Sequence, residues 1–478
     1  MEIRRKHIRA GMSLLWLLAS ALACRADPRS GATPRPTQTV DSATPTPSAV
    51  PEDCGGDGSL DVLKHSIDLA LQVAPPSLSG TGRLLVRARR ATSMLMLDAH
   101  ELKISRVAIG SSVLDFKQVG NRVCAALPRA LGRGEELALD LAWQASLAGT
   151  TPRFSEGQVW AGYSTMAWMP TIQDPAQRAS LSLRITTNAE LKVAASGRES
   201  PVSTAGVGLL THSFNLDRPT PPFLYGFAVG NFVEAELAVG DLTLRALGPP
   251  GADLNRALTI SAAIYRFLQD HLGTPLPSTE YTQIFVTGDA AQEGAGLAFL
   301  SASALADERA DPHEDWIFSH ELSHQWFGWL VPCADFSDFW LNEGFATFLV
   351  AAVKEQRWGH AAYEHEVSLW RARSSKVHAE GRDAPVSLSG QSDRPRAAPK
   401  DSELQARGVT YSRGALVLYR LRALLGDAAF WSGIRHYLAA RSGQGARTED
   451  LRASLEATSG RDLRPFFQHW VYASAPEL

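Results

Sequence analysis

Apolar and polar residues alternate in short runs between about residue 60 and residue 247, which is the period-two pattern of strands with one buried face. Gly, Pro and Asn residues separate these runs, as expected for turns. The pattern predicts an N-terminal antiparallel β domain, of sandwich or saddle type, over residues 60–250. The clearest alternating runs are Ile67–Val73, Glu136–Trp143, Ser180–Thr186 and Leu242–Arg245.

The hydrophobic period lengthens after Pro249, Pro250 and Gly251. It becomes helical over Asn255–Leu272 and again from Asp311 onward. The short apolar run Gln283–Thr287 between them predicts a strand. We therefore predict a second domain over residues 251–478 that begins with mixed α and β structure and ends mainly helical. A multidomain α and β protein agrees with a length of 478 residues and a hydrophobic content of 45%.

The first 23 residues have the pattern of a signal peptide, with a basic stretch before the apolar run Met12–Ala23. That run is too short to span a bilayer comfortably. Ala21, Leu22 and Ala23 form the small-x-small pattern of a cleavage site, and Cys24 follows. This resembles a bacterial lipoprotein signal, in which Cys24 becomes the acylated first residue, and simple secretion is the alternative. We expect an exported protein that is anchored to a membrane, or periplasmic or secreted.

Composition adds three constraints. Residues 24–59 are rich in Pro, Thr, Ser and Gly, which predicts a disordered tether. The 47 basic and 50 acidic residues give a net charge of −3, so nothing indicates a nucleic-acid partner. The four cysteines lie too far apart for a zinc finger or redox pair. Cys54 and Cys124 could form a disulfide, with free thiols as the alternative, and the state of Cys333 stays open.

Two histidines in the second domain have the spacing of metal ligands. Residues 311–314 have the composition of a helix start, and we predict a helix from there to about Val331, stopped by Pro332. Within it, His320 and His324 lie one turn apart on the apolar face, on either side of Glu321. Such histidines can also be ordinary core residues, so a further ligand is needed to decide.

Glu343 supplies that ligand. It lies nineteen positions beyond His324 in Trp340–Ala346, where a second helix is expected after capping candidates at Asp335, Ser337 and Asp338. A helical hairpin of this span can return the carboxylate to the two imidazoles. Two His and one Glu leave a fourth position open for water, which predicts one catalytic zinc. Asp335 or Asp338 is a candidate for orienting a ligating imidazole.

These motifs resemble the gluzincin aminopeptidases, the family of aminopeptidase N and leukotriene hydrolase. The resemblance includes His-Glu-x-x-His, eighteen intervening residues, and Glu within Trp-Leu-Asn-Glu-Gly-Phe-Ala. It extends to His324–Gly328 and, in the β domain, to Pro170–Ala179 and Phe227–Phe232. The resemblance covers nearly everything after the tether. It implies that the second domain is thermolysin-like and catalytic, and that Glu321 is the general base.

Two further segments resemble substrate-binding motifs of the family. Ala290–Leu297 is similar to its Gly-Ala-Met-Glu-Asn segment, which implies that Glu293 pairs with the free α-ammonium of a peptide. Backbone groups of Ala291 and Gly294 are then expected to bind the peptide as an added strand. Tyr411 opens a segment similar to Tyr-x-Lys-Gly, with Arg413 in place of Lys, which implies a hydrogen bond to the oxyanion. The family's second amine anchor has no clear equivalent among residues 160–165.

The resulting hypothesis is a zinc metallo-aminopeptidase that hydrolyses N-terminal residues from peptides with a metal-activated water. Its partners are peptides with a free N-terminus, and it needs no organic cofactor. A zinc endopeptidase of the same fold is one alternative, because the exopeptidase motif is incomplete. A non-catalytic binding protein is another, although the retention of Glu321 and Tyr411 argues against it.

Overall fold

The computed structural model describes residues 54, 58–147, 149, 151–388 and 405–474. The predicted signal peptide, Cys24 and most of the predicted tether lie outside these residues. In the part that is described, no helix is both long and apolar enough to cross a membrane. Cys54 and Cys124 form a disulfide, and Cys333 is free and buried.

The N-terminal domain is built from three sheets. The largest has eight strands in the order β13-β14-β11-β1-β2-β8-β4-β5, and its only parallel pair among the described strands is β1 with β11. The predicted antiparallel β domain is therefore confirmed, with one parallel exception. The strands are β1 (Leu60–Gln72), β2 (Ser77–Ala88), β4 (Leu102–Ile109), β5 (Ser112–Val113), β8 (Glu136–Ala145), β11 (Ala179–Asn188), β13 (Arg198–Gly206) and β14 (Leu209–Thr220).

Two smaller sheets complete this domain. A three-stranded sheet has the order β3-β7-β6, and a four-stranded sheet has the order β12-β15-β10-β9. The four-stranded sheet faces the second domain through an apolar cluster that includes Trp160 and Phe299. The strands are β3 (Thr92–Asp98), β6 (Phe116–Val119), β7 (Arg122–Leu131), β9 (Arg153–Ser155), β10 (Gln158–Ala161), β12 (Lys192–Ala195) and β15 (Phe227–Gly230).

A mixed five-stranded sheet, in the order β16-β17-β18-β20-β19, carries the helices. Its strands are β16 (Val233–Val239), β17 (Leu242–Gly248), β18 (Glu280–Val286), β19 (Ala291–Gly294) and β20 (Leu297–Ser301). The sheet joins strands from both sides of the predicted domain boundary at residue 250, because β17 pairs with β18 across the helical crossover α1 (Leu254–Leu272). Strand β19 lies at one edge, and its only partner among the described strands is β20.

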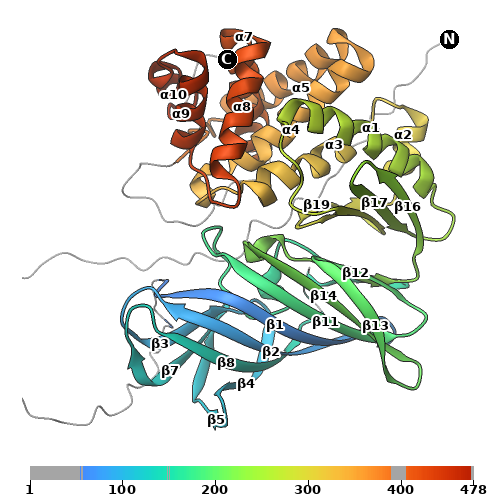
Figure 1. Ribbon diagram of the computed structural model, residues 1–478, viewed down its shortest axis with the longest axis vertical. Coiled ribbons are helices and arrows are strands. Elements are labelled where there is room, and N and C mark those ends of the chain that lie inside the picture. The colour runs from blue at the N-terminus through green and yellow to red at the C-terminus, as the bar shows by residue number, and fades with distance from the viewer. Residues whose placement is uncertain (1–53, 55–57, 148, 150, 389–404, 475–478) are drawn as a thin grey trace, which may run out of the picture.

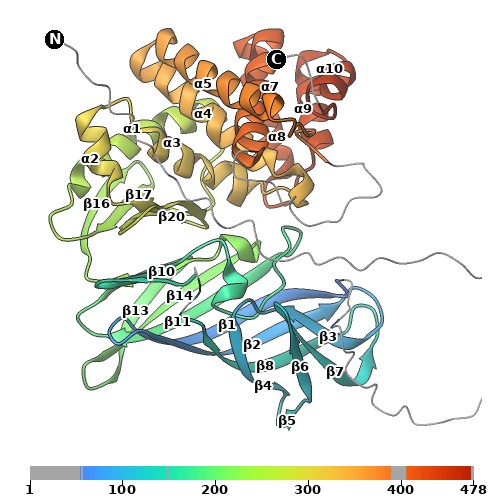
Figure 2. The same ribbon diagram turned by 180° about the vertical axis from the view of Figure 1, so that it is seen from behind.

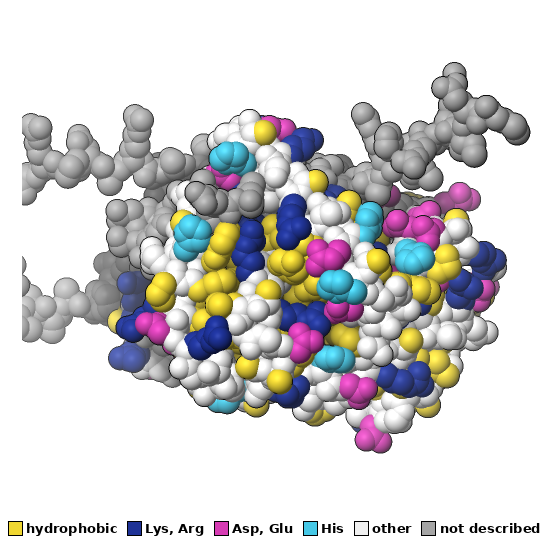
Figure 3. Space-filling view, turned by 90° about the horizontal axis from the view of Figure 1, so that it is seen from above, with side chains coloured by type: hydrophobic (Ala, Val, Ile, Leu, Met, Phe, Trp, Pro, Cys, Tyr) yellow, Lys and Arg dark blue, Asp and Glu magenta, His cyan; other side chains and the backbone are white. Residues whose placement is uncertain are grey.

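The helices form a layer on the far side of this sheet from the β domain (Figures 1 and 2). This layer confirms the prediction that the second domain is mainly helical. On its outer face, seen in Figure 3, acidic, basic and histidine side chains are interspersed around apolar ones. The elements are α2 (Ala304–Ala310), α3 (Trp316–Ser323), α4 (Trp340–Trp358), α5 (His360–Ala379), η5 (Ala406–Arg413), α7 (Gly414–Leu425), α8 (Asp427–Arg441), α9 (Thr448–Ser459) and α10 (Arg464–Trp470).

The helix with the two histidines is shorter than the sequence predicts. It begins at Trp316, because the Asp311 carboxylate accepts from the His313 amide and forms a turn there. It ends at Ser323 and continues as the π-turn η3 (Gln325–Leu330), where Phe327 and Gly328 leave helical geometry. Gly328 has a φ of 150°, which a side chain would disfavour. The kink matters for the site because it frees the Phe327 carbonyl.

Two glycines bring α4 and α7 into close contact. A Cβ added to Gly344 would lie 3.0 Å from the carbonyl carbon of Gly414, so neither helix tolerates a side chain at the crossing without moving. Glu343 directly precedes one of these glycines, and Tyr411 lies three residues before the other. The crossing therefore fixes how far apart these two functional side chains lie.

Candidate active site

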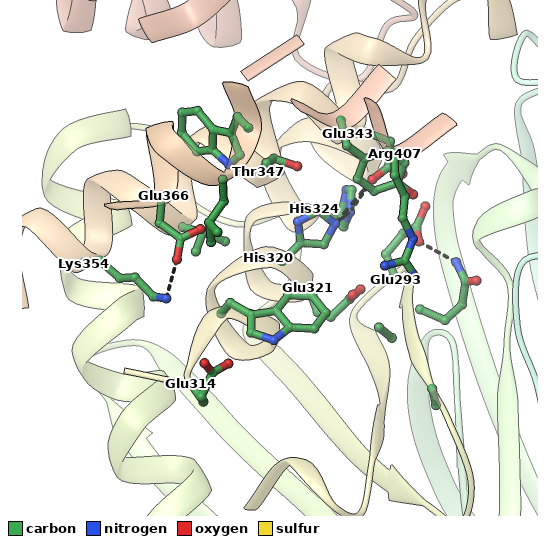
Figure 4. A pocket seen from close by; sticks show the side chains of 18 of the residues that line it. Glu293, Glu314, His320, Glu321, His324, Glu343, Thr347, Lys354, Glu366 and Arg407 are labelled. Atoms are coloured by element: carbon green, nitrogen blue, oxygen red, sulfur yellow. Dashed lines mark hydrogen bonds and ion pairs between the residues drawn. The ribbon is translucent and has the colours of Figure 1, made fainter. Parts of the chain in front are cut away.

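A cavity of about 720 Å³ is lined by side chains from both domains. The β domain contributes β9 and β10, the five-stranded sheet contributes β19, and the helical layer contributes α3, α4, α5 and η5. The predicted residues His320, Glu321, His324, Glu343 and Tyr411 all line it, together with Glu293 and Ala291. Residues more than 100 positions apart in the sequence therefore meet in one space (Figure 4).

Three of these side chains form a metal-ligand set. The Nε2 atoms of His320 and His324 lie 3.2 Å apart, and Glu343 Oε2 lies 3.3 Å from the first and 3.6 Å from the second. Tetrahedral zinc with bonds of about 2.0–2.1 Å keeps its donor atoms about 3.3 Å apart. Glu343 Oε2 is buried with no hydrogen-bond partner among the described residues. The donor types, spacing and unsatisfied oxygen fit one zinc ion.

The orientation of His324 comes from the backbone. Its Nδ1 donates to the carbonyl oxygen of Phe327 over 3.0 Å, which leaves the lone pair on Nε2 for a metal. The sequence suggested Asp335 or Asp338 for this role. Instead, the Asp335 carboxylate accepts from the Ser337 amide, and Asp338 Oδ1 accepts from the hydroxyls of Ser387 and Thr448. These acids secure the segment before α4.

Three buried carboxylates surround the same point and disfavour one another's charge. Burial is the largest cause that raises the pKa of Glu293, to about 7, and it also raises the pKa of Glu321 and Glu343. Repulsion from Glu293 and Glu343 raises the pKa of Glu321 further. Burial lowers the pKa of His320 to about 3, so this imidazole is neutral at physiological pH. Neutral imidazoles beside anionic oxygens are the state that binds a divalent cation.

Glu321 points into the cavity without a partner. Its Oε2 is buried and has no hydrogen bond within the described chain. Single ligand atoms of Glu321, Glu293 and His324 all lie within 4.8 Å of one another. The carboxylate is thus beside the metal-ligand set and separate from it, which is the position that a general base requires.

Glu293 lies on the edge strand β19, where a Gln side chain fixes its position. Gln292 Nε2 donates to Glu293 Oε2 over 2.5 Å, while Glu293 Oε1 is buried without a partner among the described residues. Gln325, next to His324 in the sequence, donates to the Gly294 carbonyl and accepts from the Gly296 amide. Ala291 lines the cavity, but Gly294 does not, because its carbonyl faces Gln325. The Gly294 carbonyl therefore helps to hold Gln325 in place, and its expected contact with substrate stays a prediction.

Tyr411 lies against the first ligand. Its ring stacks on the His320 imidazole with centroids 5.9 Å apart. Burial, followed by the Glu343 charge, raises the Tyr411 pKa well above its usual value, so the phenol keeps its proton. Its hydrogen bond lowers the pKa of Glu343, against the larger effect of burial. A protonated phenol beside the metal site can donate to a developing oxyanion.

Tyr163 is a site residue that the sequence did not indicate. It lines the cavity from the β domain, packs against Phe223 and Phe339, and has a φ of 57°. Burial raises its pKa well above the usual value, and the charges of Glu293 and Glu343 add to the effect. A lone Tyr has no motif signal. Its only sign in the sequence is its place within residues 160–165, where the family's second amine anchor is expected.

The chain is similar to known peptidases in its sequence. Residues 256–470 match the profile described as "Peptidase family M1 domain". The chain is 25% identical over 398 residues to "Leucyl aminopeptidase" of Saccharolobus solfataricus, covering 79% of this chain and 49% of that one. It is 29% identical over 232 residues to "Aminopeptidase N" of Streptomyces lividans, covering 46% and 26%. The chain thus spans less than half of the length of these relatives.

Solved structures match over more of their length. The M1 zinc metallopeptidase from Deinococcus radiodurans superposes with a TM-score of 0.71 at 26% identity, covering 88% of this chain and 97% of that one. A mutant of that protein bound to a Tyr-Ser-Ala substrate superposes with a TM-score of 0.70 at the same identity and coverage.

The geometry predicts that metal binding and proton transfer can be separated. His320→Ala, His324→Ala and Glu343→Ala each remove a donor and should lower the zinc content of the purified protein from about one per chain to well below that. Glu321→Gln keeps all three donors and should retain about one zinc. Elemental analysis after dialysis checks both expectations. Full zinc content in the three alanine variants would refute the ligand assignment.

Proposed function

Residues 256–470 match the peptidase family M1 profile, and we propose that this protein is a zinc-dependent aminopeptidase that removes N-terminal residues from peptides. One observation carries the proposal. Glu293 lies on the edge strand β19 and has a buried oxygen without a partner among the described residues, and one of its carboxylate oxygens lies within 4.8 Å of ligand atoms of His324 and Glu321. An amine anchor so close to the metal site limits cleavage to the first peptide bond.

The chain's own side chains account for the steps of hydrolysis. A zinc ion held by His320, His324 and Glu343 would supply the Lewis acid that activates water and polarises the substrate carbonyl. Glu321 accepts the proton of the attacking water and delivers it to the leaving amine. The Tyr411 hydroxyl donates a hydrogen bond to the oxyanion.

Substrate binding uses the edge of the five-stranded sheet. An extended peptide beside β19 gains backbone hydrogen bonds as an added strand, with Ala291 facing the cavity. Glu293 accepts hydrogen bonds from the α-ammonium, and the cation keeps this buried carboxylate ionised despite its raised pKa. The hydroxyl of Tyr163, on the β-domain wall of the same cavity, offers a second contact for the amine.

We also propose that the protein is exported and held at a membrane through an acylated Cys24, with simple secretion as the alternative. The basic and apolar pattern of residues 1–23 and the small residues before Cys24 support export. The disulfide between Cys54 and Cys124 supports an oxidising compartment. Mass spectrometry of the mature N-terminus should find a diacyl or triacyl Cys24 in the membrane fraction. An unmodified first residue would leave secretion as the route.

Tyr411→Phe keeps the ring that stacks on His320 and removes the oxyanion hydrogen bond. We expect kcat to fall by about 100-fold, with little change in zinc content or melting temperature. Steady-state kinetics on an aminoacyl nitroanilide, with elemental analysis and thermal unfolding on the same preparation, measures all three. A kcat near that of the wild type would remove Tyr411 from the mechanism.

Glu293→Ala tests the amine anchor and decides between aminopeptidase and endopeptidase. The wild type should cleave a free-amine peptide much faster than its N-acetylated form, and the variant should lose about 30-fold or more in kcat/KM on the free-amine peptide alone. Glu314→Ala is a matched control, because this exposed acid lines the same cavity away from Glu293 (Figure 4). Equal cleavage of free and acetylated peptides by the wild type would favour the endopeptidase.

A further inference from the structure

The segment that follows the two histidines is anchored in the β domain by one side chain. Trp329 lies in η3, five residues after His324, and its backbone N–H donates to the His324 carbonyl oxygen over 3.0 Å. The residue is 4% exposed and belongs to the buried apolar core of the β domain. Trp326, Phe327 and Leu330 of the same turn belong instead to the core of the helical domain. The metal-ligand segment is therefore packed into both domains at once.

A buried hydrogen bond orients the Trp329 indole in that core. Trp329 Nε1 donates to Thr220 Oγ1 over 3.0 Å, and both residues are buried. Thr220 ends β14, where it is paired with Ala179 on β11, and its own hydroxyl donates to the Arg218 carbonyl. The hydroxyl proton is thus used by the backbone, which leaves a lone pair for the indole. Because apolar packing has no preferred direction, this bond sets the depth and rotation of the ring.

The same ring lies over the turn that follows the edge strand β19. A Cβ added to Gly296 would lie 3.6 Å from the Trp329 ring, which is the group nearest to that face of the glycine. The neighbouring Ala295 donates its backbone N–H to the Leu224 carbonyl of the β domain over 2.8 Å. Glu293 lies only three residues before Gly296. The end of the strand that carries Glu293 is therefore held between Trp329 and the β domain.

These contacts connect the amine anchor to the metal ligands. Gln325 ties the ligand segment to the backbone of Gly294 and Gly296. Trp329 adds a second point of attachment, and two points fix both the distance and the direction of the strand, whereas one point allows it to pivot. When the ammonium of a peptide is at Glu293, the position of its first carbonyl depends on this geometry. A displacement of about 1 Å can lower the rate by about 100-fold.

We propose that Trp329 is a positioning residue for the reaction. Through Thr220 and the turn after β19, it sets the distance between the amine anchor Glu293 and the metal-ligand set, and with it the register of a bound peptide. Trp329 is not among the described residues that line the cavity, so it acts through the backbone and touches no substrate. This inference rests on the proposed aminopeptidase function, in which a substrate is held at both points at once.

The test uses two zinc-binding inhibitors that differ only in the amino group. Leucine hydroxamate offers an α-ammonium to Glu293 and a hydroxamate to the zinc, whereas 4-methylpentanohydroxamate has the same carbon chain without the amine. Calorimetric titration of the zinc-loaded protein gives both dissociation constants, which do not depend on the fraction of active protein. In the wild type we expect leucine hydroxamate to bind about 30-fold more tightly, because only this ligand pairs with the buried carboxylate.

Two variants remove the hydrogen bond from opposite sides. Trp329→Phe loses the indole N–H, and Thr220→Val loses its acceptor. Each should reduce the ratio of the dissociation constants about fivefold or more through weaker binding of leucine hydroxamate, with less than about a twofold change for 4-methylpentanohydroxamate and an unchanged zinc content. The double variant should lose no more than either single variant, because both act through one bond. Thr220→Ser retains the hydroxyl and should keep the wild-type ratio.

Trp143→Phe is the matched control. Trp143 is buried in the same β domain, its Nε1 donates to the Trp168 carbonyl oxygen over 2.8 Å, and it is not among the described residues that line the cavity. This variant also leaves a buried acceptor without its indole partner, so its melting temperature should fall. Its ratio of dissociation constants should stay at the wild-type value.

The outcomes distinguish the two proposals. A wild-type ratio near one would remove the amine anchor, and with it both the proposed function and the role of Trp329. A high wild-type ratio that persists in Trp329→Phe and Thr220→Val would overturn the positioning role alone. An equal loss in Trp143→Phe would also overturn it, because general destabilisation of the β domain would then explain the effect. If Trp329→Phe does not fold, the comparison of Thr220→Val with Thr220→Ser decides.

Discussion

Buried negative charge is the constraint on which the rest of this structure depends. Glu293, Glu321 and Glu343 converge within one cavity, and each leaves an oxygen without a hydrogen-bond partner among the described residues. Such oxygens cost free energy unless a cation or a proton compensates them. A divalent ion held by the two imidazoles and Glu343 would satisfy the unpaired Glu343 oxygen and favour the ionised form of the neighbouring carboxylates. Metal binding and the ionisation of the catalytic carboxylates are thus one coupled equilibrium.

The scaffold restricts how this charge can rearrange. The kink at Phe327 and Gly328 turns a backbone carbonyl toward His324, so the ligand's tautomer is set without a charged partner. The contact between Gly344 and Gly414 sets the spacing of α4 and α7. Gln325 joins the ligand segment to the β19 edge. These three contacts involve only neutral groups, so they add no charge to a cavity that already holds three carboxylates.

Much of the site was predictable because its chemistry needs particular residue types at fixed spacings. His320, His324 and Glu343 follow from helix periodicity and the requirement for an open zinc site, and the two-domain α and β architecture follows from the change of hydrophobic period. The shorter α3 and the role of Gln325 were not predictable, because they depend on contacts with β19 and on a local φ that composition does not determine. Tyr163 lies outside any motif. Its position depends on how the β domain packs around the cavity.

The two edges of the five-stranded sheet show how the fold selects one binding surface. Exposed edges invite pairing with other chains, and proteins commonly protect them with charge. At β16, Glu234 and Glu236 form ion pairs with Arg245 on β17. At β19, the edge lies in the cavity, and Glu293 on it has a buried oxygen without a partner among the described residues. A peptide with a blocked N-terminus would leave the buried Glu293 carboxylate facing neutral groups, which costs free energy. A peptide with a free N-terminus places its α-ammonium against that carboxylate. Inside the cavity, the unpaired Glu293 carboxylate on the edge strand therefore favours the binding of a free peptide N-terminus over other chain ends.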